Sequence, residues 1–243
     1  MRDVIAMETS VETSAAKSTT QQGRRLWWSI GVGGLLLVFV FGLLAWWPWY
    51  RQTQAIAAIE RLGGFVGTEP VGPVWLRNVV GDEVMAGYDD VQAVSLFRRS
   101  HVTVAGLVHL EGLTNLQSLT HSLQFTDAGL SHLKRLTRLK RIDLARTQVT
   151  DAGLVHLKAM TKLESLSLSD TDVTDFGIRN LKGLTSLRAL SLSYTYLTDA
   201  GLVHLVGLTN LETLSISGNQ LTNIGVKRLQ AALPGCKIMW TTW

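Results

Sequence analysis

Histidines recur at one position along the C-terminal half of the chain, in a pattern that could support metal binding. Four of the six histidines each stand directly before a leucine at equivalent positions, namely His109, His132, His156 and His204. Imidazole is a common zinc ligand, and equivalent residues of stacked strands lie about 5 Å apart. However, Asn180 interrupts the row, Arg228 ends it, and no carboxylate or cysteine recurs beside it. Duplication of a repeat explains the row more simply, so we expect no metal site.

The other combinations of reactive residues are incomplete. Three carboxylates between Asp170 and Asp175 are spaced as at the start of a calcium loop, but the glycine and distal glutamate of such a loop are missing. We therefore interpret Asp175 as a helix cap. The only cysteine, Cys236, excludes an intrachain disulfide, and we expect it to pack as a small apolar side chain. The sequence contains no recognisable catalytic motif, so we predict a protein that is not an enzyme and has no cofactor.

Residues that follow the predicted strands are better candidates for binding. One position just after successive strands is occupied by a chemically varied set, namely Arg98, Arg146, Asp170, Tyr194 and Gly218. Arginine and tyrosine are enriched among residues that contribute most to protein interfaces. We predict that a protein partner, not identified by the sequence, contacts Arg98, Arg146, Asp170 and Tyr194. Plain solvation of these side chains is the alternative. A second outward column is mostly small and hydroxylated and predicts a shallow floor, formed by Ser95, Thr120, Asp143, Ser167, Ser191 and Ser215.

A basic cluster occupies the repeat between residues 126 and 149. Six basic residues outnumber two acidic ones there, and the basic residues are Lys134, Arg135, Arg138, Lys140, Arg141 and Arg146. Such a patch can attract an anionic lipid head group, a cell-wall polymer or nucleic acid. Acidic residues of the next repeat can instead neutralise it, namely Asp151, Glu164, Asp170 and Asp172. No aromatic residues are interleaved for base stacking, so we expect no nucleic-acid partner.

A repeat of 24 residues positions all of these side chains. A threonine opens each unit, at Thr126, Thr150, Thr174, Thr198 and Thr222. Each unit contains the spacing Leu-x-x-Leu-x-Leu, seen for example at Leu139, Ile142 and Leu144. A period of 20 to 29 residues with this spacing predicts a leucine-rich repeat solenoid.

Each repeat is predicted to contain one short strand and one short helix. Apolar residues alternate with period two at Ile142 and Leu144, which is typical of a strand, and their spacing changes to threes after the Thr-Asp pair, which indicates a helix. Thr147, Thr171, Thr195 and Asn219 occupy one turn position, where we expect a structural ladder of hydroxyl groups. One glycine recurs early in each helix, from Gly106 to Gly225, and predicts close approach of neighbouring coils.

The repeat also carries a family resemblance. The run Leu-x-x-Leu-x-Leu-x-x-Thr-x-Val-Thr-Asp-Ala-Gly-Leu-x-His-Leu resembles the repeats of bacterial membrane-anchored leucine-rich repeat proteins and, more distantly, those of F-box leucine-rich-repeat proteins. The resemblance covers residues 91–233, and residues 55–80 resemble the N-terminal flank of such bacterial proteins. It implies an α/β solenoid with a parallel sheet on the concave face and short helices on the convex face. It also implies binding of a protein or ligand, and it supplies no catalytic residue.

A single membrane-spanning helix is predicted before the repeats. Residues 26–49 contain no charged residue, and 24 residues are enough to cross a hydrocarbon core of about 30 Å. Tryptophans mark both ends of this segment, at Trp27 and Trp28 and again at Trp46, Trp47 and Trp49. Such aromatic residues are typical of the two membrane interfaces. A cleaved signal peptide is the competing interpretation, but its apolar region is shorter and is followed by small residues.

The remaining segments complete the predicted organisation. We expect a disordered tail at 1–25, the transmembrane helix at 26–49, a linker helix with an N-terminal cap at 50–90, repeats at 91–233 and a C-terminal cap at 234–243. The two repeats nearest the N-terminus are irregular, since one is a residue long and the next a residue short. Trp75, Leu76, Val79 and Val80 are expected to cover the first coil.

The predicted function is a membrane-tethered module for protein-protein interaction without catalysis. A small excess of basic residues before the apolar segment places the N-terminus in the cytoplasm and the repeats outside. The alternative is a structural or envelope-adhesion protein that binds an anionic polymer through the basic coil. The overall net charge of +4 is mild and favours no particular polyanion.

Overall fold

The structure is a computed structural model that describes residues 50–61, 63–70, 78, 90–96, 107–120 and 125–241. The predicted tail and the apolar segment 26–49 lie outside the described residues, as do Arg98 and all four residues expected to cover the first coil. Residues 51–243 form one compact unit. Within the described ranges, no helix is both long and apolar enough to cross a bilayer.

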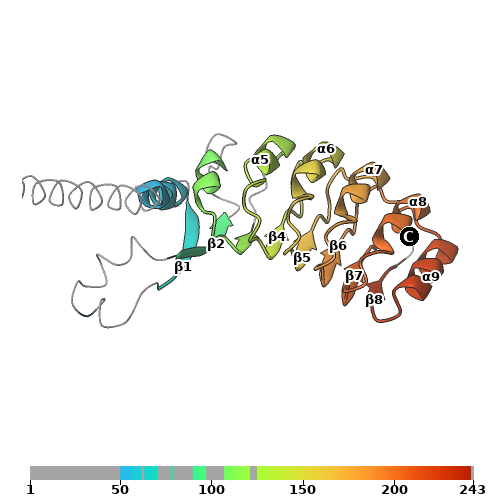
Figure 1. Cartoon of the computed structure of the whole chain (residues 1–243). Coiled ribbons are helices and arrows are strands. Elements are labelled where there is room, and N and C mark those ends of the chain that lie inside the picture. Colours follow the sequence, from blue (N-terminus) through green and yellow to red (C-terminus); the bar gives the residue numbers. More distant parts are fainter. Residues whose placement is uncertain are drawn as a thin grey trace, which may run out of the picture. The chain divides into compact units, whose positions relative to one another are not determined.

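The described strands form one sheet in which spatial order follows chain order (Figure 1). Its members are β1 (Gly64–Glu69), β2 (Asp90–Leu96), β3 (Ser118–Thr120), β4 (Arg141–Asp143), β5 (Ser165–Ser167), β6 (Ala189–Ser191), β7 (Thr213–Ser215) and β8 (Lys237–Met239). All neighbours are parallel except β1, which runs antiparallel to β2. From β4 to β8 the paired Cα atoms advance by 24 residues per step, as in Ile142, Leu166 and Leu190. The two earlier steps are 25 and 23 residues, since Val94 pairs with Leu119 and Leu119 with Ile142.

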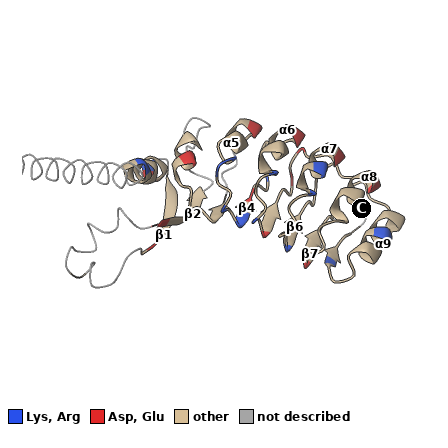
Figure 2. Cartoon of the chain, viewed as in Figure 1, with Lys and Arg blue, Asp and Glu red and all other residues tan. Residues whose placement is uncertain are grey.

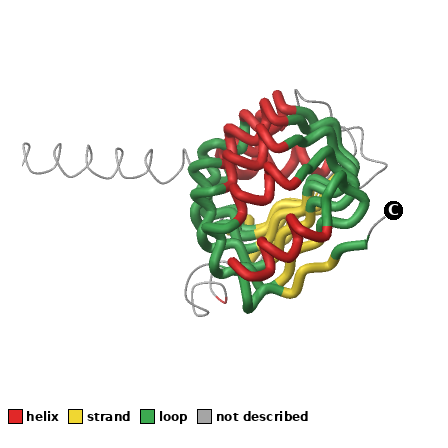
Figure 3. Tube along the Cα trace, turned by 90° about the vertical axis from the view of Figure 1, so that its right-hand side faces the viewer, coloured by secondary structure: helices red, strands yellow, loops and turns green. Residues whose placement is uncertain are grey.

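Short helices lie on the side of each coil opposite the sheet (Figure 3). They are η1 (Val108–Gly112), α5 (Asp127–Ser131), α6 (Asp151–Leu154), η2 (Val155–Leu157), α7 (Asp175–Ile178), η3 (Arg179–Leu181), α8 (Asp199–Leu202), η4 (Val203–Leu205) and α9 (Asn223–Ala232). The predicted solenoid of parallel strands and short helices is therefore confirmed. The N-cap of α7 is Thr174, whose side chain accepts a hydrogen bond from the backbone N–H of Phe176. Our interpretation of Asp175 as the cap was wrong.

The leucines of all coils meet in one continuous core. The inward strand positions and the helix positions are buried in every regular repeat, for example Leu139, Ile142, Leu144 and Leu157. Residues 50–61 form the expected helix, and its Ala55 and Ile59 belong to the same buried cluster. The strand β1, which we did not predict, covers the edge of β2. We missed it because Gly64 and Gly67 interrupt its pattern.

The last coil is closed by the C-terminal segment. Cys236 is buried, and burial raises the pKa of its thiol, so its role is packing as expected. The helix α9 is ten residues long and therefore longer than the helices of the preceding coils from η1 to η4. The segment 234–243, predicted as a cap, contributes the strand β8 and so extends the sheet by one coil.

A carboxylate ties the start of each helix to the next coil. Asp151 accepts hydrogen bonds from the backbone N–H of Thr174 (2.8 Å) and from its hydroxyl group (2.6 Å). The hydroxyl of Thr174 in turn accepts the helix N–H, so both roles of the Thr-Asp pair are explained. The same contact joins Asp127 to Thr150, Asp175 to Thr198 and Asp199 to Thr222. We call this repeated contact the aspartate clasp; its acidic residues mark the starts of α5, α6, α7 and α8 in Figure 2.

The recurring glycine leaves room for the aspartate clasp. A Cβ atom on Gly177 would lie 3.1 Å from the Cα atom of Asp151 and closer still to its Oδ1 atom. The equivalent glycines Gly153, Gly201 and Gly225 face the same obstruction. The close approach of coils that the sequence predicted is therefore confirmed for these glycines.

The turn threonines form a structural column, but their bonding differs from the predicted ladder. The hydroxyls of Thr147 and Thr171 donate to the carbonyls of Leu144 and Leu168, three residues earlier in the same coil. Among the described coils, a side-chain bond between coils at this position is made by Asn219, whose Oδ1 atom accepts the backbone N–H and the hydroxyl of Thr195. The hydroxyls of Thr147 and Thr171 are thus satisfied within their own coils.

We predict that Gly177→Ala destabilises the protein by about 1–3 kcal/mol, because the added methyl group must displace the carboxylate of the aspartate clasp. Gly183→Ala is the matched control, since a Cβ atom there meets nothing within 4 Å. It should change the free energy of unfolding by no more than about 0.5 kcal/mol. Urea unfolding followed by circular dichroism measures both, and equal midpoints for the two variants would contradict the role of the clasp.

Candidate functional site

Three of the four predicted partner residues lie on successive turns directly after the strands. Arg146, Asp170 and Tyr194 have φ values of 59°, 59° and 57°, and Gly218 on the following turn has φ 71°. They are therefore turn residues and not members of the sheet face. A positive φ favours glycine, so the three larger side chains stand where glycine would be less strained. Such strain is concentrated at functional sites.

We call the segments that lead from strand to helix the exit flank. It comprises residues 144–151, 168–175, 192–199 and 216–223. The backbone N–H groups of its turns are used between coils, since Arg146 donates to Ser169 (2.8 Å) and Asp170 to Ser193 (2.9 Å). Tyr194 donates in the same way to the carbonyl of Ser217 (2.8 Å). The turns that carry the candidate residues are consequently held in fixed register.

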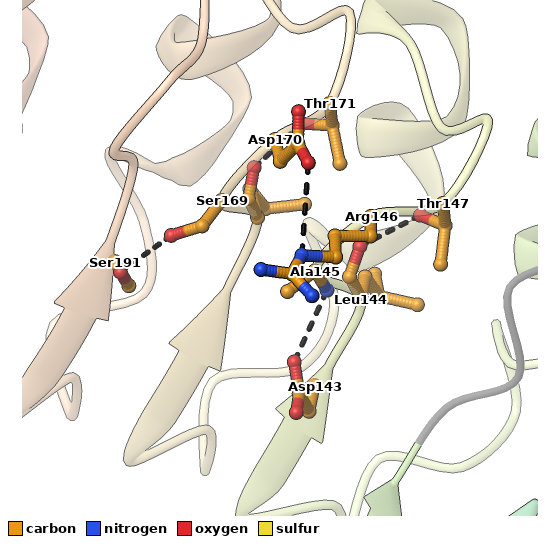
Figure 4. A network of polar contacts seen from close by, with 10 residues as sticks. Asp143, Leu144, Ala145, Arg146, Thr147, Ser169, Asp170, Thr171 and Ser191 are labelled. Carbon is orange, nitrogen blue, oxygen red and sulfur yellow. Dashed lines mark hydrogen bonds and ion pairs between the residues drawn. The ribbon is translucent and has the colours of Figure 1, made fainter. Parts of the chain in front are cut away.

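The side chains of these turns contact one another across coils (Figure 4). The Nε atom of Arg146 lies 3.7 Å from the Oδ2 atom of Asp170, and both side chains are mostly exposed, at 73% and 64%. An exposed pair at this distance contributes little to stability. The ring of Tyr194 lies over Gly218, where a Cβ atom would be 2.5 Å from its Cδ1 atom. Neighbouring coils thus place these residues side by side.

An open hollow of about 350 Å³ lies along the exit flank. Its lining comes from four consecutive coils and consists of Thr147, Gln148, Asp170, Thr171, Asp172, Tyr194, Thr195, Tyr196 and Gly218. Tyr194 and Tyr196 keep 57% and 56% of their surface exposed. The hollow includes two of the predicted residues, Asp170 and Tyr194, whereas Arg146 stands beside it. We refer to it as the Asp-Tyr hollow.

Sequence reasoning missed two of the residues that define the Asp-Tyr hollow, Asp172 and Tyr196. The backbone stays extended after each turn, as shown by isolated bridges from Thr150 to Asp172 and from Thr174 to Tyr196. Residues two apart in extended chain point the same way. Asp170 and Tyr194 stand on positive-φ turns just before these bridges, so a strand-like period did not extend to these pairs, and the fold of the turns brings Asp172 and Tyr196 into the hollow.

The exposed face of the sheet is a shallow hydroxylated floor, as predicted. Hydroxyl groups there bond to each other, with 2.8 Å between Thr120 and Ser95. Two serines on the exit flank bond to this floor, namely Ser169 to Ser191 (2.6 Å) and Ser193 to Ser215 (2.7 Å). Since these hydroxyls already have partners, the floor offers less distinctive chemistry than the exit flank.

The basic cluster is divided between the two flanks of its coil. We call the segments that lead from helix to strand the entry flank, which comprises residues 132–141, 156–165, 180–189 and 204–213. Five residues of the basic cluster lie on its first segment, namely Lys134, Arg135, Arg138, Lys140 and Arg141. Arg146 lies on the exit flank. The Nη1 atom of Arg138 donates to Asn115 (2.6 Å).

Contacts with the next coil do not neutralise the entry-flank part of the cluster. Lys140, Arg141 and Glu164 line a second hollow of about 390 Å³ together with Glu69. Among the described residues, however, no ion pair joins the five entry-flank cations to Asp151, Glu164, Asp170 or Asp172. The neutralisation that we predicted occurs as a direct contact only at Arg146, which pairs with Asp170.

The histidine row has one notable contact, at His132. Its Nδ1 atom lies 2.7 Å from the Oε1 atom of Glu111 in the preceding coil. This hydrogen bond lowers the pKa of Glu111, and nearby Lys134 and Arg135 lower it further. In the described part of the chain, no group of three or more His, Cys, Asp or Glu side chains could hold a metal ion.

We predict that Glu111→Gln reduces stability above the usual glutamate pKa of about 4.3, where the carboxylate is charged and bonded to His132. Because the pKa is lowered in the folded state, this contribution is lost as pH falls through that lowered value. Thermal melts across pH should therefore show wild type and variant converging in acid. Glu164→Gln serves as the control for loss of one carboxylate, and a difference that grows in acid would contradict the assignment.

Comparison with known proteins agrees with this architecture. The leucine rich repeat family profile matches residues 161–221. Comparison with curated protein sequences finds no significant match. Similar solved structures include an internalin C2 of Listeria monocytogenes, with a TM-score of 0.49 and 24% identity over 63% of this chain and 74% of the other. An internalin of the same organism, InlF, has a TM-score of 0.49 and 21% identity over 69% of this chain and 54% of the other. A leucine-rich repeat protein of Leptospira interrogans is also similar (0.39, 21%, 54% and 39%). The matched profile and the stacked coils together identify the fold as a leucine-rich repeat solenoid.

Proposed function

We propose that this chain is a non-catalytic, membrane-tethered module that binds a protein partner through its exit flank. The observation that carries the proposal is the Asp-Tyr hollow, in which four consecutive coils bring two carboxylates and two exposed tyrosines together. Leucine-rich repeats present extended surfaces of this kind to partners. The arrangement suits recognition because its turns are held in register by hydrogen bonds between coils.

The chemistry of the Asp-Tyr hollow supports a protein partner over a catalytic role. Tyrosine supplies a large contact area with little side-chain entropy to lose, which is why it is frequent at interfaces. Tyr194 is further restrained by its contact with Gly218. A nucleophile paired with a general base is what acyl transfer would require, and neither the hollow nor the histidine row brings such a pair together among the described residues.

Membrane tethering is supported by the sequence before the repeats. The uncharged segment 26–49 is bounded by tryptophans at both ends, and Arg24 and Arg25 precede it. This composition favours a retained anchor with the N-terminus in the cytoplasm and the repeats outside.

We expect Gly183→Cys to react with a membrane-impermeant maleimide on intact cells, because this position is open and lies in the repeats. Ser18→Cys, in the tail before the apolar segment, is the control and should react only after permeabilisation. Cys236 is buried and should add little background. The opposite labelling pattern would reverse the proposed orientation, and recovery of the chain in the fraction without membranes would exclude the anchor.

A photo-crosslinking residue in place of Gln148, which lines the Asp-Tyr hollow, should form an adduct with the partner in the full-length chain. The same residue in place of Thr137, within the basic part of the entry flank, is the positional control. Replacing Tyr194 and Tyr196 by Ala should lower the Gln148 adduct by about thirtyfold, as expected for loss of central interface tyrosines. The adducts are quantified by mass spectrometry.

The same experiment separates the proposal from the alternative role of binding an anionic polymer. Adducts that form only from position 137, and that disappear when ionic strength rises from about 0.05 to 0.5 M, would support the polymer, because exposed charges are screened by salt. A Gln148 adduct that is unchanged in the double tyrosine variant would reject the Asp-Tyr hollow as the binding site.

A further inference from the structure

Three backbone N–H groups of the Asp-Tyr hollow are already used within the protein. The backbone N–H groups of Asp170, Tyr194 and Tyr196 already donate to the carbonyls of Ser193, Ser217 and Val173. They are therefore not available to bind an anion, although turns with positive φ can otherwise form such sites. Besides the tyrosine hydroxyls and the Gln148 amide, which can also donate, the lining offers carboxylate oxygens and aromatic rings.

The threonines that line the bottom of the Asp-Tyr hollow offer hydrogen-bond acceptors to a ligand. Thr147 and Thr171 use their single hydroxyl protons on the carbonyls of Leu144 and Leu168 beneath them, at 2.7 and 2.6 Å. A hydroxyl group that donates inward keeps only its lone pairs for a ligand. The floor thus adds further acceptors to those of the rim.

The charged residues that line the Asp-Tyr hollow are all negative. Asp170 and Asp172 belong to the lining, and it contains no lysine, arginine or histidine. Among the described residues, Arg146 forms an ion pair with Asp170; it stands outside the lining and approaches Asp170 from the preceding turn at 3.7 Å. The guanidinium of Arg146 thus already interacts with one of these carboxylates. Because the ion pair is exposed, it is weak enough for a cationic ligand to replace Arg146.

The two tyrosines suit the same kind of ligand. A cation is attracted to the face of an aromatic ring, and a planar guanidinium both stacks on a ring and donates in a fork to carboxylates. The chain uses this attraction elsewhere, since the guanidinium carbon of Arg179 lies 5.6 Å from the ring centre of Phe176. Two carboxylates and two rings within one hollow combine both interactions.

We infer that the Asp-Tyr hollow receives a cationic side chain of the partner, arginine in preference to lysine, and that Arg146 competes with this side chain for Asp170. The inference rests on the proposed function, because it names the chemistry of the partner at the same site. It changes the role of Arg146, which becomes a competitor of the ligand and not a contact that holds the partner.

The test uses the four tyrosines of the chain as reporters, at Tyr50, Tyr88, Tyr194 and Tyr196. Full-length protein in non-ionic detergent is labelled with fluorotyrosine, and the four ¹⁹F signals are assigned with single Tyr→Phe variants. N-acetyl-arginine-methylamide is then titrated, with the lysine analogue in parallel. N-acetyl-citrulline-methylamide is the neutral control, because it keeps the shape of arginine and removes its charge. We expect the arginine probe to shift the Tyr194 and Tyr196 signals selectively, with weaker binding of lysine.

Matched variants assign the effect to named side chains. Replacing Asp170 and Asp172 by Asn should weaken probe binding at least about tenfold, since two charge-assisted hydrogen bonds are lost. Arg146→Ala should tighten it about threefold, because one competing charge is removed. Glu212→Gln removes an exposed carboxylate from the entry flank, where it pairs with Arg188, and should change nothing. Circular dichroism checks that each variant remains folded.

Three results would overturn the inference. They are an equal response to citrulline, no movement of the Tyr194 and Tyr196 signals up to the solubility limit of the arginine probe, and weaker probe binding in the Arg146→Ala variant. Failure of the proposed function looks different, because the Gln148 adduct would then be insensitive to the tyrosines. A tyrosine-dependent adduct without any response to the arginine probe would reject the cationic ligand but still support the Asp-Tyr hollow as the binding site.

Discussion

The aspartate clasp is the contact on which the spacing of the coils depends. Its carboxylate accepts two hydrogen bonds from the next threonine, one from the backbone and one from the hydroxyl, as between Asp151 and Thr174. On the sheet side, backbone bonds such as that from Arg188 to Glu164 hold the same two coils together. Adjacent coils are consequently joined at both faces, and the leucines between them close into a continuous dry core.

The aspartate clasp explains why threonine, aspartate and glycine recur at fixed positions of the repeat. Threonine caps its own helix and donates to the aspartate behind it, aspartate binds forward, and glycine leaves the space that the carboxylate fills. The irregular first coil fits the same account. It carries Val104 where later repeats have aspartate, and the side chain of Thr126, which would be its partner, makes no cap bond.

Because the core and the clasp fix the inward residues, the repeats differ mainly along their flanks. The entry flank carries nine lysines and arginines against two glutamates, whereas the exit flank carries one arginine against five aspartates. Three of these five aspartates, Asp151, Asp175 and Asp199, belong to clasps, so Asp170 and Asp172 are the two left to act at the surface. The Asp-Tyr hollow forms where these two carboxylates stand next to the coil with two tyrosines.

The sequence by itself determined the repeat, the alternation of strand and helix, the buried leucines and the absence of a familiar catalytic motif, because these depend on local periodicity. Only the tertiary structure showed that Asp175 binds the next coil, that Thr147 bonds within its own turn, and that β1 pairs with β2. It also separated Arg146 from the basic cluster and joined Asp172 and Tyr196 to one hollow. Periodicity places a side chain on a face of its own coil, whereas the partner of that side chain lies about 24 residues away and is decided by how the coils stack.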